Sequence, residues 1–87
     1  MKIELYLVPE DIHGKALKLF LNNNNLKFIE IIIEDINLLS SIAQTKLSNK
    51  ISLLRIKYSS SIPVIVGFNE IALNQILEHI KKYNPKV

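Results

Sequence analysis

The sequence predicts a small α/β domain with a four-stranded mixed sheet and three helices, in the order βαβαββα. Three patterns indicate this class. Residues 2–8 alternate between two faces, residues 26–33 are almost continuously apolar and β-branched, and residues 72–83 carry an apolar stripe at helical spacing. Alternation is typical of a strand, and a stripe with a 3.6-residue period is typical of a helix. Because a helix separates the first two strands, they should pair in parallel through a right-handed crossover.

Length and composition indicate a single domain, residues 1–87, that depends on packing for its stability. Hydrophobic residues make up 48% of the chain, and no cysteine is present to form a disulfide. The net charge of +3 is uneven, because residues 1–45 sum to −2 (four Lys, six Asp/Glu) and residues 46–87 to +5 (seven Lys/Arg, two Glu). A basic half can meet nucleic acid, but charge spread over this length is more typical of a solvated surface.

The sequence predicts a cytoplasmic protein without a membrane partner. No run of residues reaches the roughly 18 apolar positions that a membrane helix needs. Glu4 stands inside what would be the core of a secretory signal, so no such signal is expected. The lack of cysteine agrees with a reducing compartment.

The first two helices and the second strand follow from local signals. Pro9-Glu10-Asp11 predicts a helix start, since proline suits the first helical position and acids suit the first turn. The four asparagines 22–25 predict its end, because Asn tolerates the left-handed conformation. The β-branched run 26–33 predicts a strand buried on both faces. Glu34-Asp35 then predicts the start of a second helix over residues 36–49.

The last third of the chain predicts a hairpin and a closing helix. Residues 53–58 and 62–66 are expected strands, and the three serines between them allow an antiparallel turn. Pro63 cannot donate to a sheet ladder, so the second of these strands should lie at an edge. Asn69 is a good N-cap for the final helix, which should end near Pro85.

Three stretches are together similar to one known family. Residues 3–6 (IELY) resemble its first strand, residues 15–21 (KALKLFL) its first helix, and residues 65–70 (IVGFNE) its last strand and the Gly-Phe turn that follows. The family is the glutaredoxin/thioredoxin-like one, and the resemblance covers essentially the whole chain. It implies a thioredoxin-like fold.

The resemblance fails at the residues that carry the family's chemistry. The Cys-x-x-Cys of the family falls on Glu10-Asp11-Ile12-His13. Dithiol exchange needs a thiolate, whose pKa is lowered at a helix N-terminus. A carboxylate of Glu10 or Asp11 can occupy the same positive potential but cannot form a disulfide. We therefore expect the scaffold without thiol–disulfide activity and without a cofactor.

Two alignments of the second half compete. In the favoured one, residues 53–58 are the third strand and the family's cis-proline is lost near Leu53-Leu54. In the other, Ser61-Ile62-Pro63-Val64 matches the family's Thr-Val-Pro, with Pro63 cis, residues 50–57 helical and residues 70–73 a short last strand. The first needs almost no insertion. Only about 5–6% of X–Pro bonds in folded proteins are cis, so Ile-Pro alone is a weak signal.

Candidate ligand-binding residues lie at the start of the first helix. Glu10, Asp11 and His13 are near one another in sequence and carry groups that can ligate a metal. A fourth ligand is missing, and His79 lies far away on the last helix, so we expect no metal site and two surface histidines.

Basic residues near the third strand predict a second kind of site. Glutaredoxins use basic residues in this region to hold the carboxylates of glutathione, so the resemblance implies an anion-binding groove beside Glu10. The family's Gly-Gly pair is replaced by Gly67-Phe68-Asn69, and the acids at positions 10 and 11 would repel an anionic peptide. The basic residues concerned are Lys46, Lys50, Arg55 and Lys57.

The leading functional hypothesis is a non-catalytic module that binds a protein or a small ligand. A partner protein could bind the exposed face around the start of the first helix or the apolar edge strand 62–66, and this strand could also pair with a second copy of the chain. A second hypothesis, from the resemblance, is a glutathione-binding or glutathione-transferase-like protein that uses Tyr6 in place of cysteine. A third is binding of nucleic acid or another anion by the basic residues 46–87.

Overall fold

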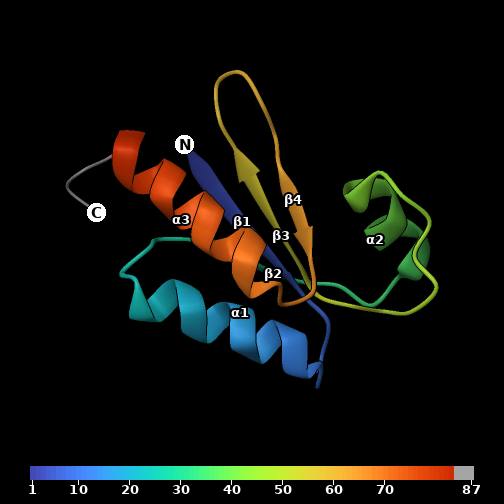
Figure 1. The fold of residues 1–87 in the computed structure, drawn as a ribbon. Helices are drawn as coiled ribbons and strands as arrows, with labels where there is room; N and C mark the ends of the chain where they lie inside the picture. The colour runs from blue at the N-terminus through green and yellow to red at the C-terminus, as the bar shows by residue number, and fades with distance from the viewer. Residues whose placement is uncertain (84–87) are drawn as a thin grey trace.

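The computed structural model describes residues 1–83, which form a four-stranded mixed sheet and three helices (Figure 1). The predicted α/β class and element order are confirmed. The strands are β1 (Lys2–Leu7), β2 (Ile29–Ile32), β3 (Leu53–Lys57) and β4 (Val64–Val66), and the helices are α1 (Ile12–Asn23), α2 (Ile36–Ala43) and α3 (Glu70–Tyr83).

The strand order across the sheet is β2-β1-β3-β4. Strands β1 and β2 are parallel, whereas β3 is antiparallel to both β1 and β4. Glu4 lies opposite Ile29 on one side and Arg55 on the other. The predicted parallel pair, the β3–β4 hairpin and the edge position of β4 are therefore all confirmed.

Helices α1 and α3 cover one face of the sheet (Figure 1), where they form the larger core. Leu17 and Leu21 of α1 and Leu73 and Ile80 of α3 are almost completely buried there. They pack on the alternate strand residues that point to this face, which are Ile3, Leu5, Leu54, Ile56 and Ile65. Burial of apolar area of this kind supplies the main stabilisation of a domain without cross-links.

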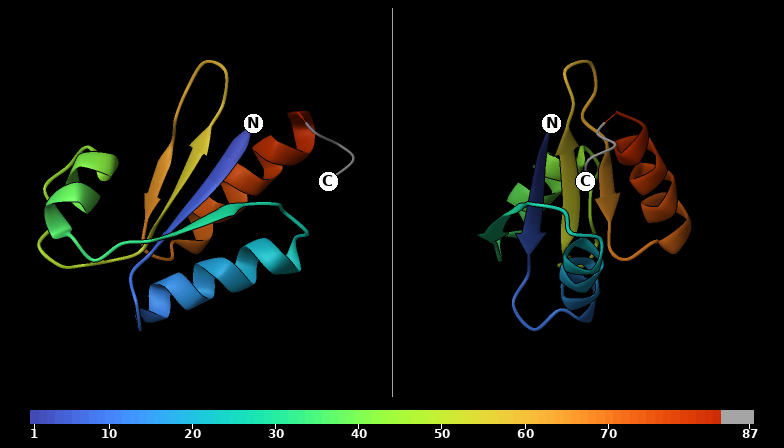
Figure 2. Two further views of the ribbon diagram at one scale, coloured as in Figure 1. Left: turned by 180° about the vertical axis from the view of Figure 1, so that it is seen from behind. Right: turned by 90° about the vertical axis from the view of Figure 1, so that its left-hand side faces the viewer.

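The other face of the sheet is covered by α2 at one end only (Figure 2). Leu39 of α2 is fully buried against the second halves of β1 and β2 and the start of β3. No described helix covers the remaining half of this face. That half carries Lys2, Glu4, Ile29, Arg55 and Lys57, which share one side of the sheet by their register. We call these five residues the open sheet face.

The first helix begins later than predicted. Asp11 is its N-cap and accepts a hydrogen bond from the His13 amide, so Pro9 and Glu10 precede the helix rather than form its first turn. Glu10 has a left-handed backbone with φ of 66°, which turns the chain from β1 into α1. The predicted role of asparagine at the other end is confirmed, because Asn25 adopts φ of 55°.

Two predictions for the middle of the chain were wrong. Strand β2 is an edge strand rather than one buried on both faces, and Ile29 and Ile32 are 46% and 66% exposed. The reason is that β3 pairs with the far side of β1 and leaves β2 without a second neighbour. Helix α2 ends at Ala43 rather than at residue 49, because Gln44 adopts φ of 58° and its amide bonds back to Ser41.

The less favoured alignment, which required a cis Pro63, was wrong. No cis peptide bond occurs among residues 1–83, and residues 53–57 form a strand, as the favoured alignment requires. The predicted N-cap of the last helix is confirmed, since the amide of Ala72 donates to Asn69 Oδ1 at 3.1 Å. The predicted helix end near Pro85 lies outside the described residues.

No helix within residues 1–83 has both the length and the apolar character needed to cross a membrane.

Gly14 lies where α1 approaches β1 most closely. A Cβ at this position would lie 2.5 Å from Ser52 Oγ and also clash with Leu7. We predict that Gly14→Ala lowers the free energy of unfolding by about 1–3 kcal/mol, although alanine is the better helix former by about 1 kcal/mol. Urea denaturation measures the change, and Lys15→Ala, at an exposed neighbour, is the control. A Gly14→Ala variant as stable as the parent would contradict this account.

Candidate functional site

The start of α1 is bound to the start of β3 through Asp11 and Ser52. Asp11 Oδ1 accepts the His13 amide at 3.2 Å, and its Oδ2 accepts the Ser52 amide at 2.7 Å. Ser52 is fully buried, and its Oγ accepts the Val8 amide at 2.8 Å. The Ser52 carbonyl accepts the Gly67 amide at 2.8 Å. These hydrogen bonds hold four separate segments together at one corner of the sheet.

The charge state of Asp11 follows from these hydrogen bonds. Burial raises the pKa of the Asp11 carboxyl, but the hydrogen bonds from Ser52 and His13 outweigh it and lower the pKa below its ordinary value of 3.8. Asp11 is therefore ionised at neutral pH. Its negative charge also lies at the positive end of the α1 dipole.

The sequence-predicted residues Glu10, Asp11 and His13 lie close to one another at this corner. Glu10 is exposed, and His13 is half-buried with its ring on the side of Gly67 where a Cβ would lie. His13 Nδ1 lies 3.9 Å from Asp11 Oδ1. Among residues 1–83 no group of three His, Asp or Glu side chains is arranged to hold a metal ion.

Arg55 and Lys57 lie away from this corner, on the open sheet face. Arg55 Nε donates to Glu4 Oε1 at 2.8 Å, and its Nη2 donates to the Tyr6 hydroxyl at 2.7 Å. Lys57 Nζ and Lys2 Nζ each lie 3.8 Å from Glu4 Oε2. The structure thus places Arg55 and Lys57 on the open sheet face rather than at the corner with Glu10, beside which the resemblance implied an anion-binding groove.

Three cations converge on the one carboxylate of Glu4. Burial raises the pKa of Glu4, but the hydrogen bond and charge of Arg55, the charge of Lys57 and the hydrogen bond from Tyr6 together lower it. Burial and the neighbouring Glu4 raise the pKa of Tyr6, although Arg55 opposes this. Tyr6 is buried and its hydroxyl is bonded to both neighbours, so it is not available as a replacement for the family's cysteine.

The sequence did not identify Glu4, Lys2 and Ser52 as members of these sites. Alternation places Lys2, Glu4 and Tyr6 on one face of β1 and Arg55 and Lys57 on one face of β3. Whether the two faces coincide depends on a pairing between residues about 50 positions apart, which no local signal gives. Ser52 lies just before a strand and belongs to no sequence motif, so nothing in the sequence identified it as a site residue.

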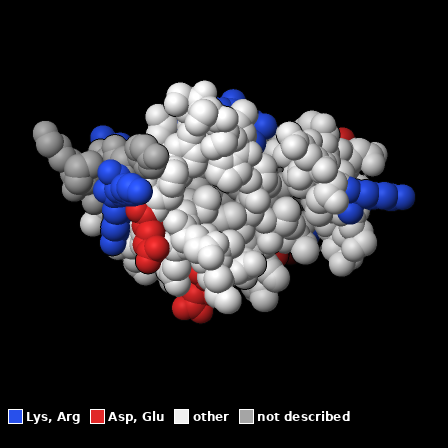
Figure 3. Space-filling model, turned by 45° about the horizontal axis from the view of Figure 1, so that its top comes forward, with Lys and Arg blue, Asp and Glu red and all other residues white. Residues whose placement is uncertain are grey.

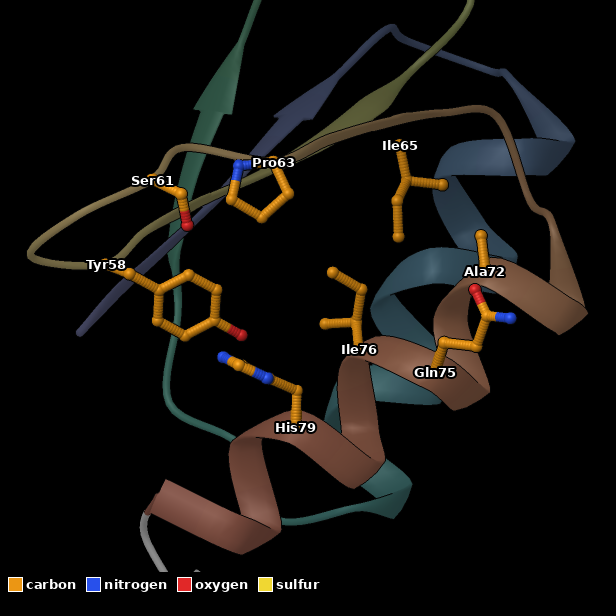
Figure 4. Close-up of a pocket in the computed structure, with 8 residues that line it drawn as sticks. All are labelled: Tyr58, Ser61, Pro63, Ile65, Ala72, Gln75, Ile76 and His79. Carbon is orange, nitrogen blue, oxygen red and sulfur yellow. The ribbon is translucent and has the colours of Figure 1, made fainter.

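A groove of about 410 Å³ lies between the β3–β4 hairpin and α3 (Figure 4). Its lining is mostly apolar and includes Pro63, Ile65 and Ile76, and its polar members are Ser61, Gln75 and His79. The Tyr58 ring forms one wall and meets the His79 ring edge-on, with centroids 4.8 Å apart.

The hydroxyl of Tyr58 is buried and has no hydrogen-bond partner among the described residues. Burial raises the pKa of Tyr58. A buried hydroxyl without a partner costs about 1–3 kcal/mol of stability. Such a group is uncommon in a folded domain and marks this end of the groove as the place to look for a bound molecule.

Comparison with known proteins adds no assignment, because no protein-family model, no curated protein and no solved structure matches the chain.

We predict that Asp11→Asn destabilises the protein by about 1–3 kcal/mol at neutral pH. Asparagine has one acceptor oxygen where Asp11 uses two, so one of the two amides loses its partner. Because folding lowers the pKa of Asp11, its carboxylate stabilises the fold at pH values above the unfolded pKa, and this contribution is lost as the pH falls through the folded pKa.

The difference in unfolding free energy between parent and variant should therefore be constant from neutral pH to about pH 4 and shrink below it. Denaturation at several pH values measures it. An equal loss at about pH 2.5 and pH 7 would show that the charge of Asp11 does not contribute.

Proposed function

We propose that the protein is a non-catalytic binding module with a thioredoxin-type fold, whose open sheet face recognises an acidic segment of a partner protein. The fold assignment is supported by the strand order β2-β1-β3-β4 with one parallel pair, and by α1 and α3 on one face and α2 on the other. The functional assignment is supported mainly by one observation, the convergence of three cations on the single carboxylate of Glu4.

A binding role rather than thiol chemistry is supported by the corner at the start of α1. The 87 residues contain no cysteine. The carboxylate of Asp11 and the hydroxyl of Ser52 are both used in backbone hydrogen bonds that hold the corner closed. Neither group is left to act as a nucleophile or a base, since Ser52 is fully buried.

The open sheet face has the charge and exposure that an acidic partner requires. Lys2 and Lys57 are exposed or half-exposed, and Arg55 is partly exposed beside the fixed carboxylate. Two positive charges remain after Glu4 is counted. Ile29, 46% exposed, lies opposite Glu4 and offers an apolar contact next to the charges. Charge complementarity at such a face gives orientation and faster association.

A protein carboxylate fits this face better than a nucleic acid. Single-stranded RNA is bound by stacking bases on exposed aromatic side chains. Tyr6 is the one aromatic residue on this face of β1 and β3, and it is buried beneath the Arg55 guanidinium, whose carbon lies 5.3 Å from the ring centroid. Three cations around a retained carboxylate also form a small site rather than a track along a phosphate backbone.

The edge strand β4, expected from the sequence to pair with a partner or a second copy, is a weaker candidate. It is three residues long and directly follows Pro63. The Pro63 carbonyl accepts the Ile56 amide and the Gly67 amide donates to the Ser52 carbonyl, so by alternation only Val64 and Val66 turn their backbone groups outward. Two residues offer few main-chain hydrogen bonds to another strand.

The proposal predicts that labelled poly-L-glutamate binds the protein at low ionic strength and dissociates as salt is added. The double variant Lys2→Gln, Lys57→Gln should weaken binding about fivefold or more, because each exposed ion pair contributes up to about 1 kcal/mol. Fluorescence anisotropy measures the affinity. The control is Lys15→Gln, which removes an exposed charge from α1, on the opposite face of the sheet.

Two results would contradict the proposal. One is an equal loss of poly-L-glutamate binding in the Lys15→Gln control and in the double variant, since this would indicate attraction to net charge alone. The other is tighter binding of oligo-uridine than of poly-L-glutamate at the same salt concentration, which would indicate a nucleic-acid site. Circular dichroism of each variant checks that the fold is retained.

A further inference from the structure

We propose that the groove between the β3–β4 hairpin and α3 binds a small amphiphile with an apolar body and a single carboxylate head. This site is independent of the proposed acidic-partner site, because it lies on the other face of the sheet. The volume of about 410 Å³ is within the range of small-molecule sites, which is roughly 300–1,000 Å³. A groove of this size accommodates a short alkyl or aromatic body rather than a protein segment.

The apolar body is indicated by the lining of the groove. Pro63 and Ile65 come from the hairpin, and Ala72 and Ile76 come from the facing turns of α3 (Figure 4). The surrounding surface of the hairpin and α3 is largely uncharged, with charged side chains toward the margins of this view (Figure 3). Transfer of an apolar ligand from water to such a surface is favourable in proportion to the area that it covers.

The carboxylate head is indicated by the polar groups at one end. Tyr58 has a hydroxyl without a hydrogen-bond partner among the described residues, and its ring lines the groove. His79 lies beside it, and Lys82 follows His79 by three residues, so both side chains lie on the same side of α3. A carboxylate accepts strong hydrogen bonds from a hydroxyl and from a cationic side chain, and it would satisfy the Tyr58 donor.

The position of His79 explains how the head would enter. Its ring lies edge-on against the Tyr58 ring, with centroids 4.8 Å apart, and the residue is exposed at the surface (Figure 4). Rotation of an exposed side chain is a fast and small change. The Tyr58 hydroxyl is buried beside this ring, so entry of the head requires the His79 side chain to rotate away from it.

Octanoate is a suitable probe, with octan-1-ol as the matched ligand without the charge. We expect octanoate to shift the amide resonances of Ser61, Ile65, Ala72 and Ile76 saturably, with a fitted affinity at least about fivefold tighter than that of octan-1-ol. Tyr58→Phe should weaken octanoate binding about tenfold, as expected for loss of a hydrogen bond to a charged group. The same variant should be as stable as the parent or more stable, because the hydroxyl has no partner to lose.

Gln75→Glu places a carboxylate at an exposed position on the rim of the groove. It should weaken the binding of octanoate but not the binding of octan-1-ol. Asn74→Asp, one residue away and outside the lining, is the matched control and should leave the affinities for both ligands unchanged. The proposal is overturned by shifts confined to other parts of the molecule, by equal octanoate affinity in the parent and Tyr58→Phe, or by equal effects of the two acidic substitutions. Equal affinity for both ligands would overturn the carboxylate assignment.

Discussion

The hydrogen bonds of Asp11 and Ser52 hold together the segments on which the rest of this structure depends. The end of β1, the start of α1, the start of β3 and the end of β4 all meet there, and each contributes an amide or a carbonyl to the joint. The close approach of Gly14 to Ser52 completes it, because a Cβ at position 14 would clash with the Ser52 and Leu7 side chains. Buried polar groups are stabilising only when they are paired in this way.

This joint also determines which charged group lies at the start of α1. The sequence resemblance implies a Cys-x-x-Cys at the start of the first helix, where the helix dipole lowers a thiol pKa. Here the carboxylate of Asp11 lies at the positive end of the helix dipole. Its second oxygen accepts the amide of Ser52, which directly precedes β3. The electrostatic feature that would activate a thiol therefore stabilises the fold here.

The sequence predicted those parts of the fold that depend on local signals. Alternation located β1 and β3, asparagines marked the end of α1 and the cap of α3, and Pro63 identified an edge strand. The wrong prediction for β2 has a tertiary cause. The apolar run before α2 was expected to be buried on both faces, yet its exposure depends on which strand pairs with β1, and that pairing is decided by tertiary contacts.

The candidate sites were harder to predict for the same reason. Arg55 and Lys57 were selected for their charge, but their partner Glu4 is about 50 residues away and is adjacent only through the sheet register. The Tyr58 groove depends on the angle at which α3 crosses the hairpin, which periodicity does not specify. Glu10, Asp11 and His13 are close in the chain and were therefore found together, but the two backbone hydrogen bonds that Asp11 accepts, one of them from Ser52, could not be predicted.

The two proposed surfaces meet at the end of β3, where neighbouring residues point to opposite faces of the sheet. Lys57 lies on the open sheet face and Tyr58 lines the groove. A shift of the β3 backbone would move both, whereas a change at the tip of one side chain would alter only its own surface. Substitutions that remove one charge or one hydroxyl therefore report on each surface separately. A mutation in β3 that affects both ligands would indicate that the strand itself had moved.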